Sequence, residues 1–160
     1  MNWVYLNDLF IQKQDAKISP FDRGFLFGDA VYEVIPVYDR KVFLFSEHMS
    51  RLESSLLKTG INKPKVWNQI HNIIDELIDK NSHPNQAVYL QISRGEDVER
   101  NHLPRRNIKP TLFINSSELT INPYRLNPNK VGIEVKTSED QRWGRCDVKA
   151  VTLLSNVMAL

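Results

Sequence analysis

Apolar and polar positions alternate along several short stretches of the chain, which predicts strands that bury one face. The stretches at 3–6 and 9–11 flank Asn7 and Asp8, two residues that tolerate a left-handed turn, so a hairpin is expected there. Further strands are predicted over 30–38, 42–45, 87–94, 110–116 and 131–136.

The strand at 30–38 has two chemically different faces. Val31, Glu33, Ile35 and Val37 share one face, and Tyr32, Val34, Pro36 and Tyr38 share the other. Pro36 lacks an amide donor, which favours an edge strand or a bulge. In the strand at 87–94, Val88, Leu90 and Ile92 are expected to face the core, with Tyr89 on the other side.

Apolar residues at helical spacing predict two helices between these strands. Ser46 can cap the first, which is expected to run to about Thr59 and stop at Gly60. The second is expected to open at Asn62 or Lys63 and to end near Asn81. The apolar stripes are Met49, Leu52, Leu56 and Leu57, and then Val66, Ile70, Ile73, Ile74, Leu77 and Ile78.

The asparagine- and proline-containing stretch at 117–129 predicts a linker. We therefore expect an α+β fold, with an N-terminal domain at 1–120 and a linker plus the beginning of a C-terminal domain at 121–160. The second part holds one predicted strand and a helical pattern from Ala150, which is too little to close a core. The chain is expected to be truncated or incompletely recorded.

Composition excludes several classes of function. The chain can bury a core because 41% of its residues are hydrophobic, and its net charge of +2 comes from scattered residues without a nucleic-acid stripe. No apolar run reaches membrane-spanning length, and the N-terminus does not read as a signal peptide. The single cysteine, Cys146, excludes an internal disulfide framework and favours the cytoplasm; it is expected to be buried. The histidines lack ligand spacing, so no metal site is expected.

Lys149 lies where a polar segment gives way to the apolar residues 150–154. A lysine at such a junction can be partly removed from water, which disfavours its ammonium form. A neutral amine is a nucleophile that can form a Schiff base with an aldehyde cofactor. From these residues alone, an ordinary surface lysine before a helix is the more common interpretation.

Several blocks, spread in order over nearly the whole chain, carry a resemblance to one family. They are Asp22–Val34 (DRGFLFGDAVYEV), Glu47–Leu52 (EHMSRL), Tyr89–Gly95 (YLQISRG), Arg100–His102 (RNH) and Arg142–Lys149 (RWGRCDVK). Together they resemble the class IV (fold type IV) aminotransferases that use pyridoxal 5'-phosphate, and most of all the D-amino acid transaminases. The resemblance implies a small N-terminal α/β domain, followed by a larger C-terminal domain that binds the cofactor.

The resemblance implies roles for two cations. Lys149 would form the Schiff base with the cofactor and move the proton between the substrate α-carbon and cofactor C4′. Arg51 would bind the cofactor phosphate with its planar fork of donors. On the helical wheel Arg51 lies opposite Leu52 and Leu56, so a solvated arginine is the alternative; the family role requires a second buried helix face.

The resemblance also implies a substrate site. Arg100 and His102, two residues apart on the polar loop at 96–106, would bind the substrate carboxylate from the partner subunit of a homodimer. Tyr32 and Tyr89 would line the same site. The alternatives are solvated loop charges and packing tyrosines.

The expected function is transfer of an amino group between a D-amino acid, such as D-alanine or D-glutamate, and a 2-oxo acid. The alternatives are a branched-chain aminotransferase, an aminodeoxychorismate lyase, or an inactive fragment that serves as a dimerising or binding module. In the family, the glutamate facing the cofactor ring nitrogen and the loops completing the phosphate cup lie beyond residue 160. If Leu160 is the true end, little or no cofactor binding is expected.

Overall fold

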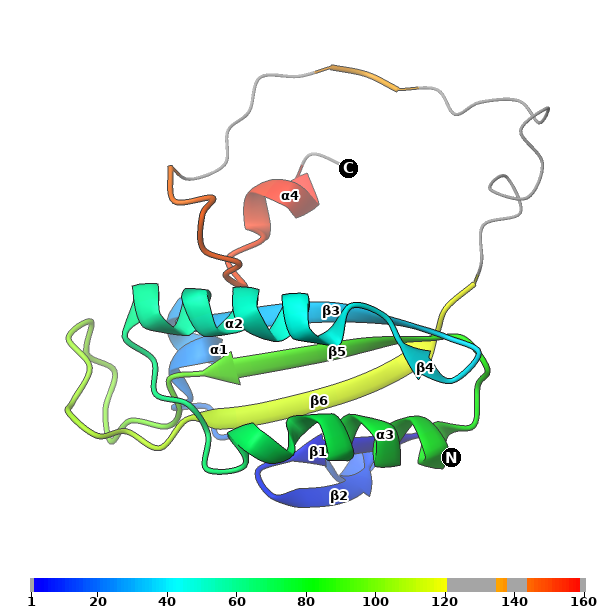
Figure 1. Ribbon diagram of the computed structural model, residues 1–160. Helices are drawn as coiled ribbons and strands as arrows, with labels where there is room; N and C mark the ends of the chain where they lie inside the picture. Colours follow the sequence, from blue (N-terminus) through cyan, green and yellow to red (C-terminus); the bar gives the residue numbers. More distant parts are fainter. Residues whose placement is uncertain (1, 121–134, 138–143, 159–160) are drawn as a thin grey trace.

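The computed structural model describes residues 2–120, 135–137 and 144–158. Its centre is a six-stranded antiparallel sheet with the order β2-β1-β6-β5-β3-β4 (Figure 1). The strands are β1 (Trp3–Leu6), β2 (Leu9–Gln12), β3 (Ala30–Tyr38), β4 (Lys41–Val42), β5 (Gln86–Ser93) and β6 (Thr111–Glu118). The predicted α+β class is confirmed.

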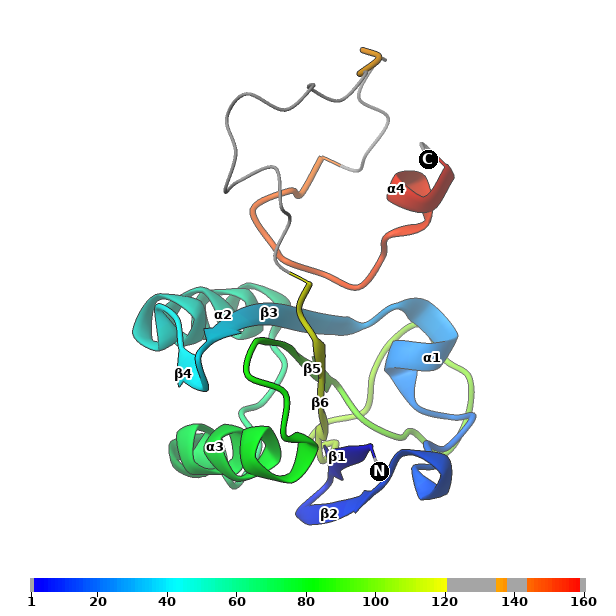
Figure 2. The ribbon, with the colours of Figure 1, turned by 90° about the vertical axis from the view of Figure 1, so that its right-hand side faces the viewer.

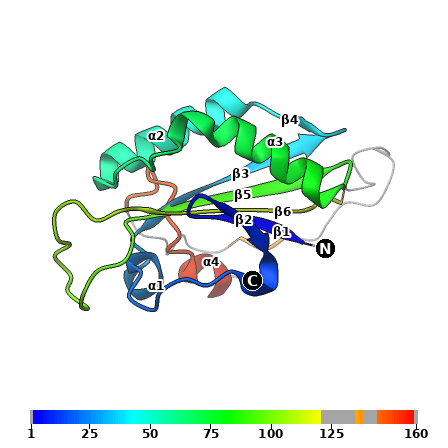
Figure 3. The ribbon, with the colours of Figure 1, turned by 90° about the horizontal axis from the view of Figure 1, so that it is seen from below.

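Helices α2 (Phe45–Thr59) and α3 (Ile70–Asn81) lie together on one side of this sheet (Figure 3). The short helices α1 (Arg23–Phe27) and α4 (Leu154–Met158) lie on the opposite side. Two 3-10 helices, Lys13–Asp15 and Trp67–Gln69, complete the regular structure of the described residues. One sheet face is therefore covered by long helices, whereas the other is only partly covered.

The core lies between the sheet and helices α2 and α3. Leu52 and Leu56 of α2 are buried against the inward-facing strand residues, as the stripe predicted, and each such side chain contributes about 1.5–3 kcal/mol by its burial. Leu57 is 82% exposed, so its place in that stripe was wrong; buried Ser55 occupies the inner face instead. The other fully buried large apolar residues are Ile35, Ile70, Ile74, Leu77, Leu90, Ile92, Leu112 and Ile114.

The turn predicted at Asn7 and Asp8 is confirmed, whereas β3, the strand that holds Pro36, is not an edge strand, because β4 lies on its other side. Asn7 and Asp8 have positive φ angles of 44° and 76° in the β1–β2 hairpin. The carbonyl of Pro36 accepts a hydrogen bond from the amide of Phe43, so the backbone nitrogen and carbonyl of Pro36 point away from β5. The missing amide donor of Pro36 therefore removes no bond between β3 and β5.

Three element boundaries differ from the predictions. The strand expected at 42–45 is only Lys41–Val42, because Leu44 takes a left-handed conformation with φ 48° and α2 begins at Phe45. Ser46 therefore lies inside the helix and does not cap it. Helix α3 begins at Ile70, since Pro64 opens a turn whose carbonyl accepts from the amide of Trp67.

The described segment 144–158 lies beyond the β3 edge of the sheet (Figure 2). Val148 is buried in the main core, and Ala150 forms an antiparallel bridge with Val31. Cys146 is exposed, which corrects the expectation that it is buried. The linker beyond residue 120 and most of the strand at 131–136 lie outside the described residues, so the proposed division at 120/121 stays a prediction.

Candidate active site

The sheet face opposite α2 and α3 carries an aromatic cluster. The register of β3, β5 and β6 places Tyr32 opposite Gln91, and Gln91 opposite Phe113. Tyr89 lies diagonally between them, with its ring centroid 5.6 Å from that of Tyr32 and 6.4 Å from that of Phe113. The two predicted site tyrosines are therefore neighbours on one face of the sheet.

Tyr89 is held in this cluster by its hydroxyl, which donates to Oε1 of Gln91 at 2.6 Å. Burial, together with the neighbouring Tyr32, raises the pKa of Tyr89 to about 12. A phenol with such a pKa stays protonated at neutral pH and presents a dipole without a charge.

The backbone around Lys149 is fixed by the N-terminal part of the chain. Its carbonyl accepts from the amide of Tyr32 at 3.0 Å, and its amide donates to Oγ of Ser55 at 3.4 Å. On either side, Val148 is buried in the core and the amide of Val151 donates to the carbonyl of Ala30 at 3.1 Å. Lys149 is thus attached as an added strand residue at the outer edge of β3.

The side chain of Lys149 extends over Tyr32. Its Nζ lies 3.8 Å from the centroid of the Tyr32 ring, within the range of a cation–π contact. Lys149 is half-buried, so one side of the amine faces the ring while the side chain stays partly accessible. The structure therefore brings three of the six predicted site residues together: Lys149, Tyr32 and Tyr89.

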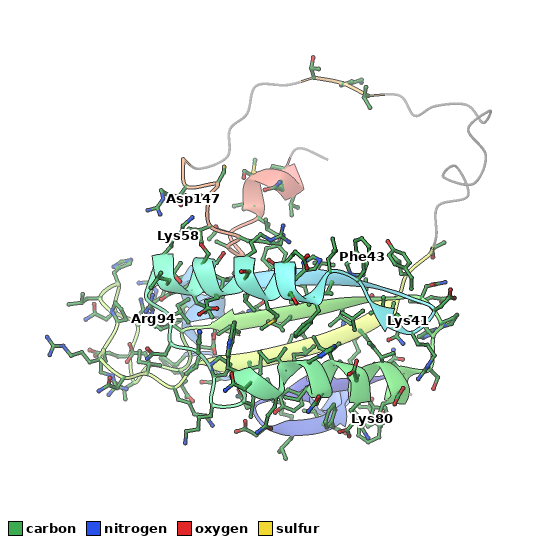
Figure 4. The ribbon with its side chains drawn as sticks, in the orientation of Figure 1. Lys41, Phe43, Lys58, Lys80, Arg94 and Asp147 are labelled. Carbon is green, nitrogen blue, oxygen red and sulfur yellow. The ribbon has the colours of Figure 1, made fainter. Side chains whose placement is uncertain are left out.

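A surface ion pair ties the preceding residues to α2. Nζ of Lys58 lies 3.1 Å from Oδ2 of Asp147, and the two side chains meet beyond the C-terminal half of α2 (Figure 4). Arg145 also pairs with Asp147, at 3.0 Å. Hydrogen bonds from Arg145 and Lys58 lower the pKa of Asp147. Because all three side chains are well exposed, their pairing contributes little stability and chiefly fixes where the segment lies.

Arg51 lies on α2 and forms an ion pair with a buried carboxylate. Its Nε and Nη2 each lie 2.6 Å from an oxygen of Glu33, which is 0% exposed. His48 Nδ1 contacts the same carboxylate at 2.8 Å. Glu33 comes from the core-facing side of β3, so this cluster lies on the helix-covered side of the sheet.

The electrostatics of this cluster favour the ion pair. Burial by itself would raise the pKa of Glu33, but the hydrogen bonds from Arg51 and His48 outweigh it, and the pKa is lowered. The Glu33 hydrogen bond in turn raises the pKa of Arg51. Within the described residues no group bonds to Nη1 of Arg51, whose side chain is 55% exposed, so donors remain for an anion.

Arg100 and His102 come together on the ring of Phe27. The guanidinium carbon of Arg100 lies 5.1 Å from the ring centroid, and the centroid of the His102 ring lies 5.4 Å from it. Both residues are exposed, on the loop that follows β5, where no regular element was predicted or is present. No hydrogen bond, ion pair or ring contact links either residue to Lys149 in the part of the chain that the structure describes.

Sequence reasoning missed Glu33, His48, Ser55 and Phe27 as parts of these clusters. Glu33 was detectable as the one charged residue among the apolar positions of its strand face. Ser55 gave no signal, since its contact to Lys149 joins residues far apart in sequence. Arg142 and Trp143 of the quoted lysine block lie outside the described residues.

No helix among the described residues is long and apolar enough to cross a membrane. In the same residues no group of three His, Cys, Asp or Glu side chains is arranged to hold a metal ion.

Comparison with known proteins gives consistent matches. The profile of the family described as "Amino-transferase class IV" matches residues 30–160. The D-alanine aminotransferase of Staphylococcus epidermidis is 33% identical over 159 residues, covering 99% of this chain and 55% of that protein. The chain thus spans about half the length of the curated relatives it matches.

Solved structures share the fold. The branched-chain amino acid aminotransferase of Escherichia coli superposes with a TM-score of 0.68 at 22% identity, covering 74% of this chain and 40% of that one. A hypothetical aminotransferase from Mycobacterium tuberculosis, solved in its PLP-bound form, has a TM-score of 0.60 at 20% identity, covering 74% and 40%. At these identities the likeness shows the fold alone, and that fold is fold type IV, as expected.

Proposed function

The chain belongs to the class IV aminotransferases, and on that premise we propose that it forms part of a pyridoxal 5'-phosphate-dependent D-amino acid transaminase. The observation that carries the proposal is the placement of Lys149, whose amine lies over Tyr32 at the rim of the aromatic cluster. When bound, pyridoxal 5'-phosphate supplies an aldehyde for covalent attachment and a ring that withdraws electrons from the substrate.

The residues present fit this cofactor at two points. Lys149 offers a partly accessible amine to the aldehyde, and its backbone is fixed on both sides by hydrogen bonds to Tyr32 and Ser55. A fixed backbone limits the positions that Nζ can reach, which suits an amine that must remove a proton from the substrate α-carbon and later return one. Lys149 is therefore assigned both attachment and proton transfer.

Arg51 is assigned to the cofactor phosphate. Glu33 and His48 hold the guanidinium from the protein side, which leaves the Nη1 donors for a phosphate on the solvent side. A guanidinium presents donors in a fixed fork, and orientation by Glu33 reduces the entropy lost when the phosphate binds. The ion pair with Glu33 thereby supports the role expected for Arg51.

Tyr32 and Tyr89 are assigned to the wall of the substrate site, where their rings exclude water. Arg100 and His102 are assigned to the substrate carboxylate, because a guanidinium and an imidazole at one ring can bind a small anion together. Since no contact joins them to Lys149 within the described residues, we assign this pair to the active site of the partner subunit in a homodimer. We assign the homodimer to the cytoplasm.

The names of the relatives support the proposed substrate preference. A protein named D-alanine aminotransferase matches 99% of this chain at 33% identity, whereas the branched-chain enzyme of Escherichia coli matches at 22% and shares the fold only. We therefore assign D-alanine or D-glutamate as amino donor and a 2-oxo acid as acceptor.

The division into an N-terminal domain at 1–120 and a cofactor-domain segment from 121 is part of the same proposal.

The test is a substrate comparison on the protein purified with pyridoxal 5'-phosphate. Pyruvate formation from D-alanine and 2-oxoglutarate is measured beside 2-oxo acid formation from L-leucine. The proposal expects turnover of D-alanine and a large preference over L-leucine. Turnover of L-leucine without D-alanine would contradict the assignment of Arg100 and His102, and release of pyruvate from aminodeoxychorismate would indicate a lyase.

A further inference from the structure

Phe27, at the end of α1, is contacted by three nitrogen-bearing side chains. The guanidinium carbons of Arg23 and Arg100 lie 4.7 and 5.1 Å from the ring centroid. The centroid of the His102 ring lies 5.4 Å from the same point. Stacking of guanidinium and imidazole groups on an aromatic ring restricts their orientation, because each prefers the electron-rich face or a tilted geometry.

Arg23 fixes the backbone beneath the two loop residues. Its Nη1 donates to the carbonyl of Asn101 at 2.6 Å, and its Nη2 donates to the carbonyl of His102 at 2.9 Å. Its side chain is only 4% exposed, and its charge is balanced by Asp29 at 2.9 Å and Asp97 at 3.6 Å. The guanidinium of Arg23 is therefore fully engaged in hydrogen bonds and ion pairs that have a structural role. These bonds hold the loop to α1 at this point, although the loop has no regular structure.

Arg100 is in a different state from Arg23. In the described part of the chain no carboxylate pairs with its guanidinium and no hydrogen-bond acceptor contacts it, so its donors are available. His102 likewise has a ring contact and no described hydrogen bond from its ring nitrogens. The ring of Phe27 thus carries one clamped cation and two side chains with available donors.

We infer that Phe27 is a positioning residue that presets Arg100 and His102 for a small carboxylate. This inference rests on the proposed function, in which those two side chains bind the substrate carboxylate. An arginine side chain loses much rotational freedom when it binds, and stacking on Phe27 removes part of that freedom beforehand. Loss of the ring while an apolar side chain is kept should weaken carboxylate binding about two- to fivefold, the usual range of a cation–π contact at an exposed site.

The experiment is a titration of the isotopically labelled protein with propionate, a carboxylate without an amino group, at constant ionic strength. Nuclear magnetic resonance follows the His102 imidazole and the Arg100 Nε–H. The wild-type protein should show a saturable shift of both groups and nuclear Overhauser effects from the Phe27 ring to His102. Phe27→Leu should raise the propionate dissociation constant two- to fivefold, and Phe27→Tyr should leave it close to wild type.

Phe43→Leu is the matched control. Phe43 is 48% exposed and also packs on one aromatic partner, Tyr38, at 5.8 Å, but lies at the opposite end of α2 from Lys58 (Figure 4). The unfolding midpoint of Phe43→Leu should fall no further than that of Phe27→Leu, because Phe43 is the more exposed ring, and propionate affinity should be unchanged. A merely structural role of Phe27 would affect only the midpoint.

The variants separate the two claims. If Arg100→Ala binds propionate as the wild type does, or if the wild type shows no shift, the proposed carboxylate role fails and the inference falls with it. If Arg100→Ala loses binding while Phe27→Leu retains full affinity, the inference alone is overturned. Absence of Overhauser effects between Phe27 and His102 would also overturn it.

Discussion

Nζ of Lys149 lies 3.8 Å from the centroid of the Tyr32 ring, and the carbonyl of Lys149 accepts a hydrogen bond from the amide of the same tyrosine. One residue of β3 therefore fixes both the backbone and the side chain of the lysine. This arrangement joins the lysine segment to the edge of the sheet, with Val148 buried beneath it. The amine of Lys149 accordingly has a defined position relative to the aromatic cluster.

Replacing Tyr32 should show how much its ring contributes to the attachment of pyridoxal 5'-phosphate to Lys149. Tyr32→Leu removes the ring that limits where the Lys149 amine can lie, so attachment of pyridoxal 5'-phosphate should weaken about two- to tenfold, the cost of ordering one long side chain, whereas Tyr32→Phe should retain it. The dissociation constant is measured by absorbance titration of the cofactor. Equal affinities for the leucine and phenylalanine variants would show that the ring does not orient the amine.

Removing Arg51 should destabilise the fold because it leaves the carboxylate of Glu33 buried with only His48. Loss of one partner of a buried ion pair usually costs about 3–5 kcal/mol; because Arg51 is itself exposed, we expect about 2–3 kcal/mol for Arg51→Ala. The double variant Arg51→Ala/Glu33→Gln should recover part of this loss. Urea unfolding at pH 7 measures both.

Arg40→Ala is the matched control for that experiment. Arg40 pairs with Asp79, and both side chains are exposed, so its loss should cost about 0.5 kcal/mol or less. If Arg51→Ala costs no more than Arg40→Ala, the buried carboxylate does not depend on Arg51.

Acidification should remove the contribution of the charged Glu33 carboxylate to the free energy of unfolding. Its folded-state pKa is lowered from the ordinary value of 4.5, so the charged form stabilises the fold fully above pH 4.5. That contribution is lost as the pH falls below 4.5 and through the lowered pKa. The difference in unfolding free energy between wild type and Glu33→Gln, measured by urea unfolding from pH 7 to pH 3, should therefore shrink on the acid side. A difference that stays constant with pH would contradict the lowered pKa.

Two glycines should respond differently to alanine. A Cβ at Gly24 would lie 2.8 Å from Cβ of Ser93 and 2.9 Å from Oδ1 of Asp22, so α1 or β5 must shift. A Cβ at Gly60 meets nothing within 4 Å, and only its positive φ of 64° opposes it. We expect Gly24→Ala to cost about 1–3 kcal/mol and Gly60→Ala about 1 kcal/mol, with only the former altering α1. Thermal unfolding measures the costs, and a larger loss at Gly60 would contradict the close approach of α1.

The fold was largely predictable because alternation and helical spacing report burial directly. The positions Val31 to Val37 fall on the predicted faces, and the missing amide donor of Pro36 points away from β5. The beginning of α3 was not predictable, since a turn at Pro64 has the same local signals as a helix start. The positive φ of Leu44 has no sequence signal either, because leucine rarely takes that conformation.

For the candidate active site, the residues could be predicted from the sequence, but most of their contacts could not. The family blocks singled out Lys149, Tyr32 and Tyr89, which the fold brings together, but their pairing depends on the β3 edge and not on local spacing. The ion pair of Glu33 with Arg51 joins a strand to a helix, so no periodicity could show it. The same holds for Phe27, whose contacts to Arg100 and His102 connect α1 with a loop without regular structure.

The most direct test of the account is the site of covalent attachment of pyridoxal 5'-phosphate. The protein is incubated with the cofactor, reduced with borohydride, digested, and the modified peptide is identified by mass spectrometry. We expect the pyridoxyl group on Lys149 and its disappearance in Lys149→Ala. A group attached specifically to another lysine such as Lys58, or retained in Lys149→Ala, would contradict the assignment of the catalytic amine.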